Sequence, residues 1–162
     1  MRWLRERRAQ TMASGVLVIL LLLVTAATVV DGLHLLTTRQ RSLEIASAAA
    51  LQGTSRGRDY AHYLATGQIA LDVGTARDEA IGAADAALAA LGLSGFTIQV
   101  EVLDAPGGGS LPGFPPGQTW TEVEPAVGVY LEVPVQTVFV HMISGDSAVT
   151  LHVFAAAGVE ME

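Results

Sequence analysis

The sequence predicts an α+β fold in which a long N-terminal helix packs on a small antiparallel β-sheet. Apolar residues keep a helical period from a charge-free run at 12–30 onwards, whereas apolar and polar residues alternate with a period of two after Phe96. A sheet built from such strands needs a cover for its apolar face, and the amphipathic continuation of the long helix can provide it.

Residues 12–30 form an apolar run that ends at Asp31. Four arginines precede it: Arg2, Arg5, Arg7 and Arg8. At about 1.5 Å per residue, a helix of this length spans roughly 28 Å, which matches the hydrocarbon core of a bilayer. Because basic residues beside a span stay on the cytoplasmic side, we expect a cytoplasmic segment 1–11, a transmembrane helix 12–30 and an extracytoplasmic domain 31–162.

The alternative for the N-terminal segment is a cleaved secretory signal, since basic residues, an apolar stretch and the small residues Ala26 and Ala27 also define a signal peptide. The apolar run exceeds the roughly 7–15 residues of a typical signal, and its helical pattern continues beyond Asp31. A retained anchor is therefore favoured. Under both interpretations the rest of the chain is exported, and with no Cys it has no disulfide framework.

The charge of the exported part limits its partners. Beyond residue 30 the chain has five arginines, no lysine and fifteen acidic residues. Such a surface disfavours nucleic acid. The remaining length of about 130 residues suits one modest core, so a single domain is expected.

Three helices are predicted after the anchor, at about 32–52, 59–66 and 75–91. The first continues the anchor and ends before Gly53. Its apolar stripe is expected to pack against protein: Leu33, Leu36, Leu43, Ala46 and Ala50. Thr75, followed three residues later by Asp78, is a signature of a helix start.

Three strands are predicted at about 96–103, 127–135 and 148–159, each with alternating apolar residues. Pro134 cannot donate a ladder hydrogen bond, so its strand is expected at an edge of the sheet or to end there. The Gly- and Pro-rich stretch 104–125 reads as a long exposed loop.

Short motifs near both ends of the chain point to one family. The arginine cluster is followed by Gln10, Thr11 and Met12, where members commonly read Gly-Gln-Thr-Met or similar. Further matching residues are Asp31, Gly32, Leu33, Arg39, Arg41 and the Ala-rich stretch 46–51. Alternating valines, a turn centred on Gly145 and a last strand into 155–160 complete the pattern. In these motifs the chain resembles the TadE/TadG-like proteins of tight-adherence (Flp) pilus assembly, which implies a pilin-like domain on a membrane anchor.

The chain departs from this family where prepilin-like members are cut. At the cleavage site of those members a Gly is followed five residues later by Glu, whereas Ala9 and Ser14 occupy these two positions here. Loss of the acid removes the usual pairing partner in a helix bundle. The chain therefore looks more like the unprocessed, TadG-like members, and cleavage near Ala9 or near Ala27 is the alternative.

The sequence contains no convincing catalytic, cofactor-binding or metal-binding site, so we expect neither an enzyme nor a cofactor. His141 and His152 could face each other across a hairpin, but zinc needs three or four ligands and no Cys or third nearby His is evident. Asp31 and Glu44 are more than three helical turns apart and cannot act together as an acid–base pair. The glycines 107–109 precede no helix and lack the Lys-Ser/Thr of a phosphate-binding loop.

Two pairs of residues are candidates for contacts with other proteins. Thr28 and Gly32 lie four residues apart near the outer end of the span, a small-xxx-small pattern that permits close helix packing. Phe114 and Trp120 are large apolar residues in loop 104–125, and such residues often anchor interfaces. The alternative for both rings is that they fold back onto the chain's own sheet.

The family resemblance implies a non-enzymatic structural or assembly component of a tight-adherence pilus or a related secretion system. The expected partners are membrane lipid and other pilus-assembly or membrane-complex proteins, in a homo- or hetero-oligomer. Two alternatives stay open: a small single-span accessory subunit of another membrane complex, and an exported binding module.

Overall fold

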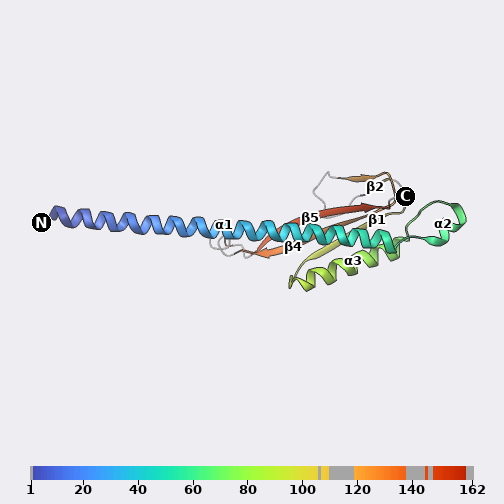
Figure 1. Cartoon of the computed structure of the whole chain (residues 1–162), viewed down its shortest axis with the longest axis horizontal. Coiled ribbons are helices and arrows are strands. Elements are labelled where there is room, and N and C mark those ends of the chain that lie inside the picture. The colour runs from blue at the N-terminus through green and yellow to red at the C-terminus, as the bar shows by residue number, and fades with distance from the viewer. Residues whose placement is uncertain (1, 106, 110–118, 138–144, 146–147, 160–162) are drawn as a thin grey trace. The chain divides into compact units, whose positions relative to one another are not determined.

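The computed structural model describes residues 2–105, 107–109, 119–137, 145 and 148–159, with side chains from Ser14 onwards. Three helices come first: α1 (Arg2–Arg56), α2 (Tyr60–Thr66) and α3 (Val73–Ala90). The strands follow: β1 (Thr97–Leu103), β2 (Gly107–Gly109), β3 (Trp120–Glu122), β4 (Ala126–Gln136) and β5 (Ala148–Gly158). The fold is therefore α+β, with a long apolar N-terminal helix and a small antiparallel sheet (Figure 1).

The chain divides into two compact units. Met1–Thr37 and Gln136–Val149 form one unit, and Thr38–Val135 and Thr150–Glu162 form the other, because the residues within each have most of their contacts with one another. The second unit begins at Thr38, within α1. We call this second unit the sheet unit.

The main sheet has the strand order β1-β4-β5. β1 and β4 are antiparallel, with Thr97 opposite Glu132 and Leu103 opposite Ala126. The expectation that the strand with Pro134 lies at an edge or ends there is wrong, because β4 is the middle strand and continues to Gln136. The register explains how proline is accommodated: β1 begins at Thr97, opposite Glu132, so Pro134 lies past the last β4 residue paired with β1 and needs no hydrogen bond on that side.

One face of the main sheet is covered by the C-terminal part of α1 and by α3 (Figure 1). Alternate residues of β4 point to this side and are buried: Val127, Val129, Leu131, Val133 and Val135. The helices contribute Ala46, Ala49, Ala50, Ala76, Ala80, Ala84 and Leu88 to the same core. Small side chains on both helices let their backbones lie close to the sheet and to each other.

The expected leucine stripe of the long helix is only partly buried. Ala46 and Ala50 lie in the core, but Leu33, Leu36 and Leu43 are exposed. The helix instead buries a face of small residues, namely Thr38, Ser42, Ala46, Ala49 and Ala50. Close approach to the sheet favours these small side chains over leucines, which leaves the leucines on the outer side.

Two helix ends differ from the sequence prediction. α1 continues through Gly53 to Arg56, so Gly53 is not its C-terminal stop. α3 begins at Val73 rather than Thr75, because Asp72 caps it: its Oδ1 accepts a hydrogen bond of 2.7 Å from the backbone N–H of Thr75. The hydrogen bond from the backbone N–H of Thr75 holds the pKa of Asp72 below its ordinary value of 3.8, and the side chain of Thr75 lowers this pKa further.

Candidate functional site

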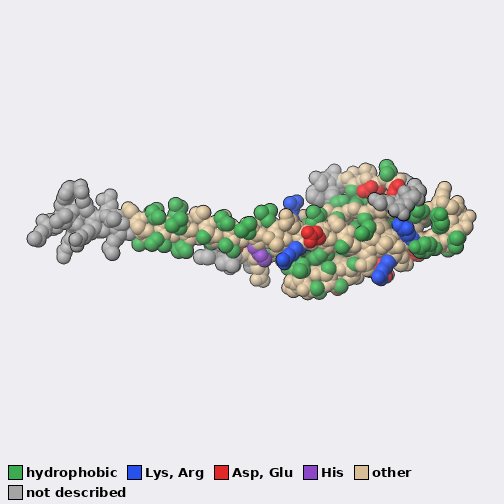
Figure 2. All heavy atoms as spheres, in the orientation of Figure 1, with side chains coloured by type: hydrophobic (Ala, Val, Ile, Leu, Met, Phe, Trp, Pro, Cys, Tyr) green, Lys and Arg blue, Asp and Glu red, His purple; other side chains and the backbone are tan. Residues whose placement is uncertain are grey.

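The apolar part of α1 has the properties of a membrane span. Among the described residues, one helical segment, Ser14–Arg56, is long and apolar enough to cross a bilayer. Its large side chains from Val16 to Val24 are 44–67% exposed (Figure 2). The hydroxyls of Thr25 and Thr28 donate to the carbonyls of Leu21 and Val24 at 2.8 Å. Polar groups on this surface thus find partners within the helix itself, as a lipid environment requires.

The candidate packing pair of this helix is accessible. Thr28 is exposed, and a β-carbon added at Gly32 would meet no described atom within 4 Å. The four N-terminal arginines lie on the first turns of the same helix, where the structure describes the backbone alone. Their role in topology and the packing role of Thr28 and Gly32 stay predictions.

Trp120 lies inside the sheet unit and not on its surface. It is 7% exposed and tilts against Phe154 of β5, with ring centroids 5.7 Å apart. The indole also covers Gly128, where an added β-carbon would lie 2.7 Å from Cζ2 of Trp120. Trp120 therefore folds back onto the chain's own sheet, and its buried ring is not available as a partner contact. Phe114 lies outside the described residues.

Three polar side chains meet on the sheet face opposite the helices. The Oη of Tyr130 lies 2.7 Å from Nδ1 of His152 and donates to Oε1 of Glu132 at 3.3 Å. Burial raises the pKa of Tyr130 above 10.0, and the negative charge of Glu132 adds to this shift. The stacked Tyr130 and His152 rings tie β4 to β5. His141, the expected neighbour of His152, lies outside the described residues.

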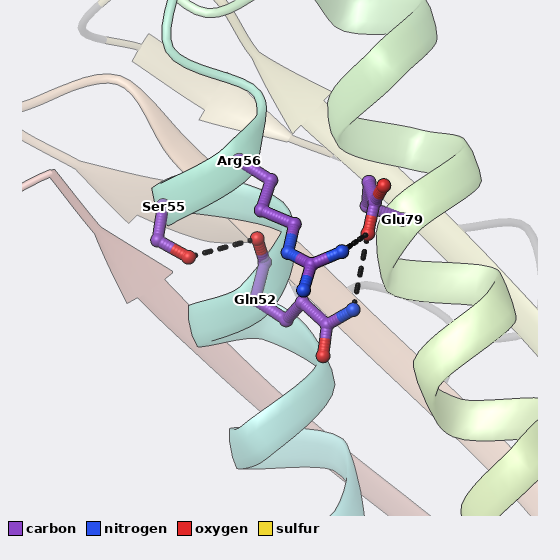
Figure 3. A network of polar contacts seen from close by, with 4 residues as sticks. All are labelled: Gln52, Ser55, Arg56 and Glu79. Atoms are coloured by element: carbon purple, nitrogen blue, oxygen red, sulfur yellow. Dashed lines mark hydrogen bonds and ion pairs between the residues drawn. The ribbon is translucent and has the colours of Figure 1, made fainter.

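Polar side chains at the C-terminal end of α1 contact Glu79 of α3 (Figure 3). The guanidinium of Arg56 lies 3.2 Å from Oε2 of Glu79, and the side-chain amide of Gln52 donates to the same oxygen at 3.0 Å. Arg56 is well exposed, so this ion pair is worth little in stability. It joins the C-terminal end of α1 to the N-terminal half of α3.

An open groove runs between α1 and α3 beyond this junction. It has a volume of about 920 Å³, and its lining comes from Arg41 to Gln52 on α1 and from Gly82 to Leu91 on or directly after α3. Half of the lining residues are alanine, and Arg41 and Glu44 are its charged members. Sequence reasoning missed this groove, although the many alanines on both helices hint that little side-chain volume fills the space between them.

Within the described residues, no three residues of the types His, Cys, Asp and Glu come together as metal ligands. Gly107–Gly109 forms strand β2, paired with β3, and not a phosphate-binding loop before a helix. Asp31 is buried and Glu44 is exposed, and both lie on the same helix. The expectation of a non-catalytic chain stays a prediction.

No protein-family model, curated protein or solved structure matches this chain. What the fold defines is a class: an α+β protein whose first helix is long and apolar enough to span a membrane. Membership of the TadE/TadG-like family stays a prediction from the sequence motifs.

Proposed function

We propose that this protein is a non-enzymatic, membrane-anchored structural or assembly component, similar to the TadE/TadG-like proteins of tight-adherence pili. In this proposal α1 spans the membrane once, with its N-terminus in the cytoplasm and the sheet unit outside. The sheet unit then presents its surface to other proteins of a pilus or secretion complex.

The observation that supports this proposal is the exposure of a charge-free apolar helical surface. Nearly every residue from Ser14 to Val30 is exposed, including a run of large aliphatic side chains. Such a surface is unfavourable in water, at roughly 25 cal/mol for each Å² of apolar area. A lipid bilayer removes this cost without a protein partner, and the arginines before the span favour a cytoplasmic N-terminus.

The topology can be tested because the natural chain contains no cysteine. We would compare the full-length single-cysteine variants Glu6→Cys and Leu64→Cys in intact cells, using a maleimide that cannot cross the membrane. Leu64 is 85% exposed in the sheet unit. We expect label on Leu64→Cys alone, and label on Glu6→Cys only after the cells are opened. Label on Glu6→Cys in intact cells would contradict the orientation.

Retention of the anchor needs a separate measurement. Intact mass spectrometry of the membrane-extracted protein should find residues 2–30 still attached. A mature N-terminus near Ala27 would instead identify a cleaved signal. The identity of the proteins that copurify would show whether the chain belongs to a pilus or secretion complex or to another membrane complex.

A further inference from the structure

The groove between α1 and α3 exists because the two helices touch near Gly53, whereas farther along them no large side chain fills the space between them. A β-carbon at Gly53 would lie 2.8 Å from the carbonyl oxygen of Ala76 and 3.0 Å from Cβ of Ala80. Away from this contact, the facing positions are short side chains such as Ala48 and Ala86, which do not fill the space. The result is an apolar hollow of the length of three helical turns, about 17 Å along α1.

We propose that this groove holds the α1 helix of a second copy of the same chain. The inference rests on the proposed function, because α1 is one continuous helix from the apolar segment through the groove. Copies anchored in one membrane therefore present residues 41–52 at the same level and with the same direction. A neighbouring α1 is the segment that reaches the groove without any change in the fold.

The outer side of α1 supplies side chains that suit the groove. Leu43 and Leu51 are 47% and 62% exposed. They lie eight residues apart, about 12 Å along the helix, which fits within the length of the groove. An alanine-lined hollow accepts leucines as knobs into holes, and their burial removes apolar surface from water.

Charge at the groove also favours a second copy. The sheet unit is strongly acidic, which opposes association in general. The groove lining, however, contains one cation, Arg41, and one anion, Glu44. Both are exposed, and neither takes part in an ion pair among the described residues. Glu44 lies seven residues before Leu51 and so on the same side of α1, and an incoming helix that inserts Leu51 brings the Glu44 carboxylate toward Arg41 of the groove.

The contact joins two different surfaces of the chain, the groove of one copy and the leucine side of α1 of the next. Such a heterologous contact repeats from copy to copy and forms a ring or a row in the membrane. The groove is thus the acceptor and the exposed leucines are the donor of a lateral self-association.

Cross-linking between two differently tagged, full-length variants tests this contact. Leu43→Cys and Ala86→Cys would be coexpressed in membranes and oxidised, with Leu64→Cys as the matched control for Leu43→Cys. We expect a mixed disulfide for Leu43→Cys with Ala86→Cys and several-fold less for the control. Adding Arg41→Glu to the Ala86→Cys copy should reduce the yield several-fold, and adding Glu44→Arg to the Leu43→Cys copy should restore it.

The outcomes separate this inference from the proposed function. An alkali-resistant membrane protein that gives no Leu43–Ala86 disulfide, or gives as much with Leu64→Cys, overturns the self-association and leaves the anchor standing. A disulfide that does not respond to the charge exchange also overturns it. Loss of the protein from the membrane fraction overturns both proposals.

Discussion

Gly53 of α1 lies directly against the backbone of Ala76 of α3, so close that a β-carbon on Gly53 would be 2.8 Å from the carbonyl oxygen of Ala76. Real β-carbons do not approach a backbone oxygen this closely without a shift. Gly57 is in contact with Ala76 in the same way. The close contact of the two helices therefore depends on the absence of side chains at Gly53 and Gly57. The groove lies next to this contact, between the same two helices.

We expect Gly53→Ala to destabilise the full-length protein by about 1–3 kcal/mol, because the new methyl group must displace backbone. This loss exceeds the gain of roughly 0.5–1 kcal/mol that alanine brings over glycine inside a helix. Gly82→Ala is the matched control, since its β-carbon meets nothing within 4 Å, and it should stabilise α3. Thermal unfolding in detergent measures both, and equal midpoints for the two variants would contradict the close contact.

Trp120→Ala should lower the free energy of unfolding by roughly 3–5 kcal/mol, the usual cost of removing a buried large aromatic. The reason is the loss of its contacts with Phe154 and Gly128. Val123→Ala, at a side chain that is 85% exposed, serves as the control and should change stability by less than about 0.5 kcal/mol. If Trp120→Ala leaves the unfolding free energy unchanged but weakens assembly with other proteins, the prediction is wrong and the ring is a partner contact.

Asp72 makes the stability of α3 depend on acid pH. Hydrogen bonds from Thr75 hold its pKa in the folded state below 3.8, so folding favours the ionised carboxylate. The stabilisation is fully present above pH 3.8 and is lost as the pH falls through the lower pKa of the folded state. Asp72→Asn keeps a capping oxygen without this titration. The difference in unfolding temperature between the natural protein and Asp72→Asn should therefore change on acidification below pH 3.8 and be constant above it.

The helices and the strands β1, β4 and β5 could be predicted because their residue patterns are local, whereas β2 and β3 lie in the stretch 104–125 that was expected to be a loop. Alternation predicted the ends of β1, β4 and β5 to within one residue, and the apolar run identified the exposed segment of α1. The buried face of α1 could not be predicted by the same reasoning, because leucines and alanines both fit a helical stripe. Which of them faces the sheet depends on how closely the helix approaches, and only the packed structure determines that.

Pro134 and Trp120 show the same limit from the side of the sheet. Pro134 is tolerated in the middle strand because β1 begins only at Thr97, opposite Glu132, and the strand order is not encoded in the alternation. Burial of Trp120 in β3 needs a glycine, Gly128, on β4, a strand of the other sheet with which β3 is not paired. The groove, likewise, arises from two helices that are separated along the chain.

Leu22→Arg should prevent stable membrane integration, because arginine at the centre of a span costs about 2.5–3.5 kcal/mol on insertion scales. Leu22 is 63% exposed on α1, so its replacement removes little packing within the protein. Leu64→Arg makes the same change at an exposed residue of the sheet unit and should leave integration intact. Alkaline extraction of membranes with quantitative immunoblotting measures both variants. If Leu22→Arg resists extraction as well as the natural protein does, the segment around it is not the membrane span.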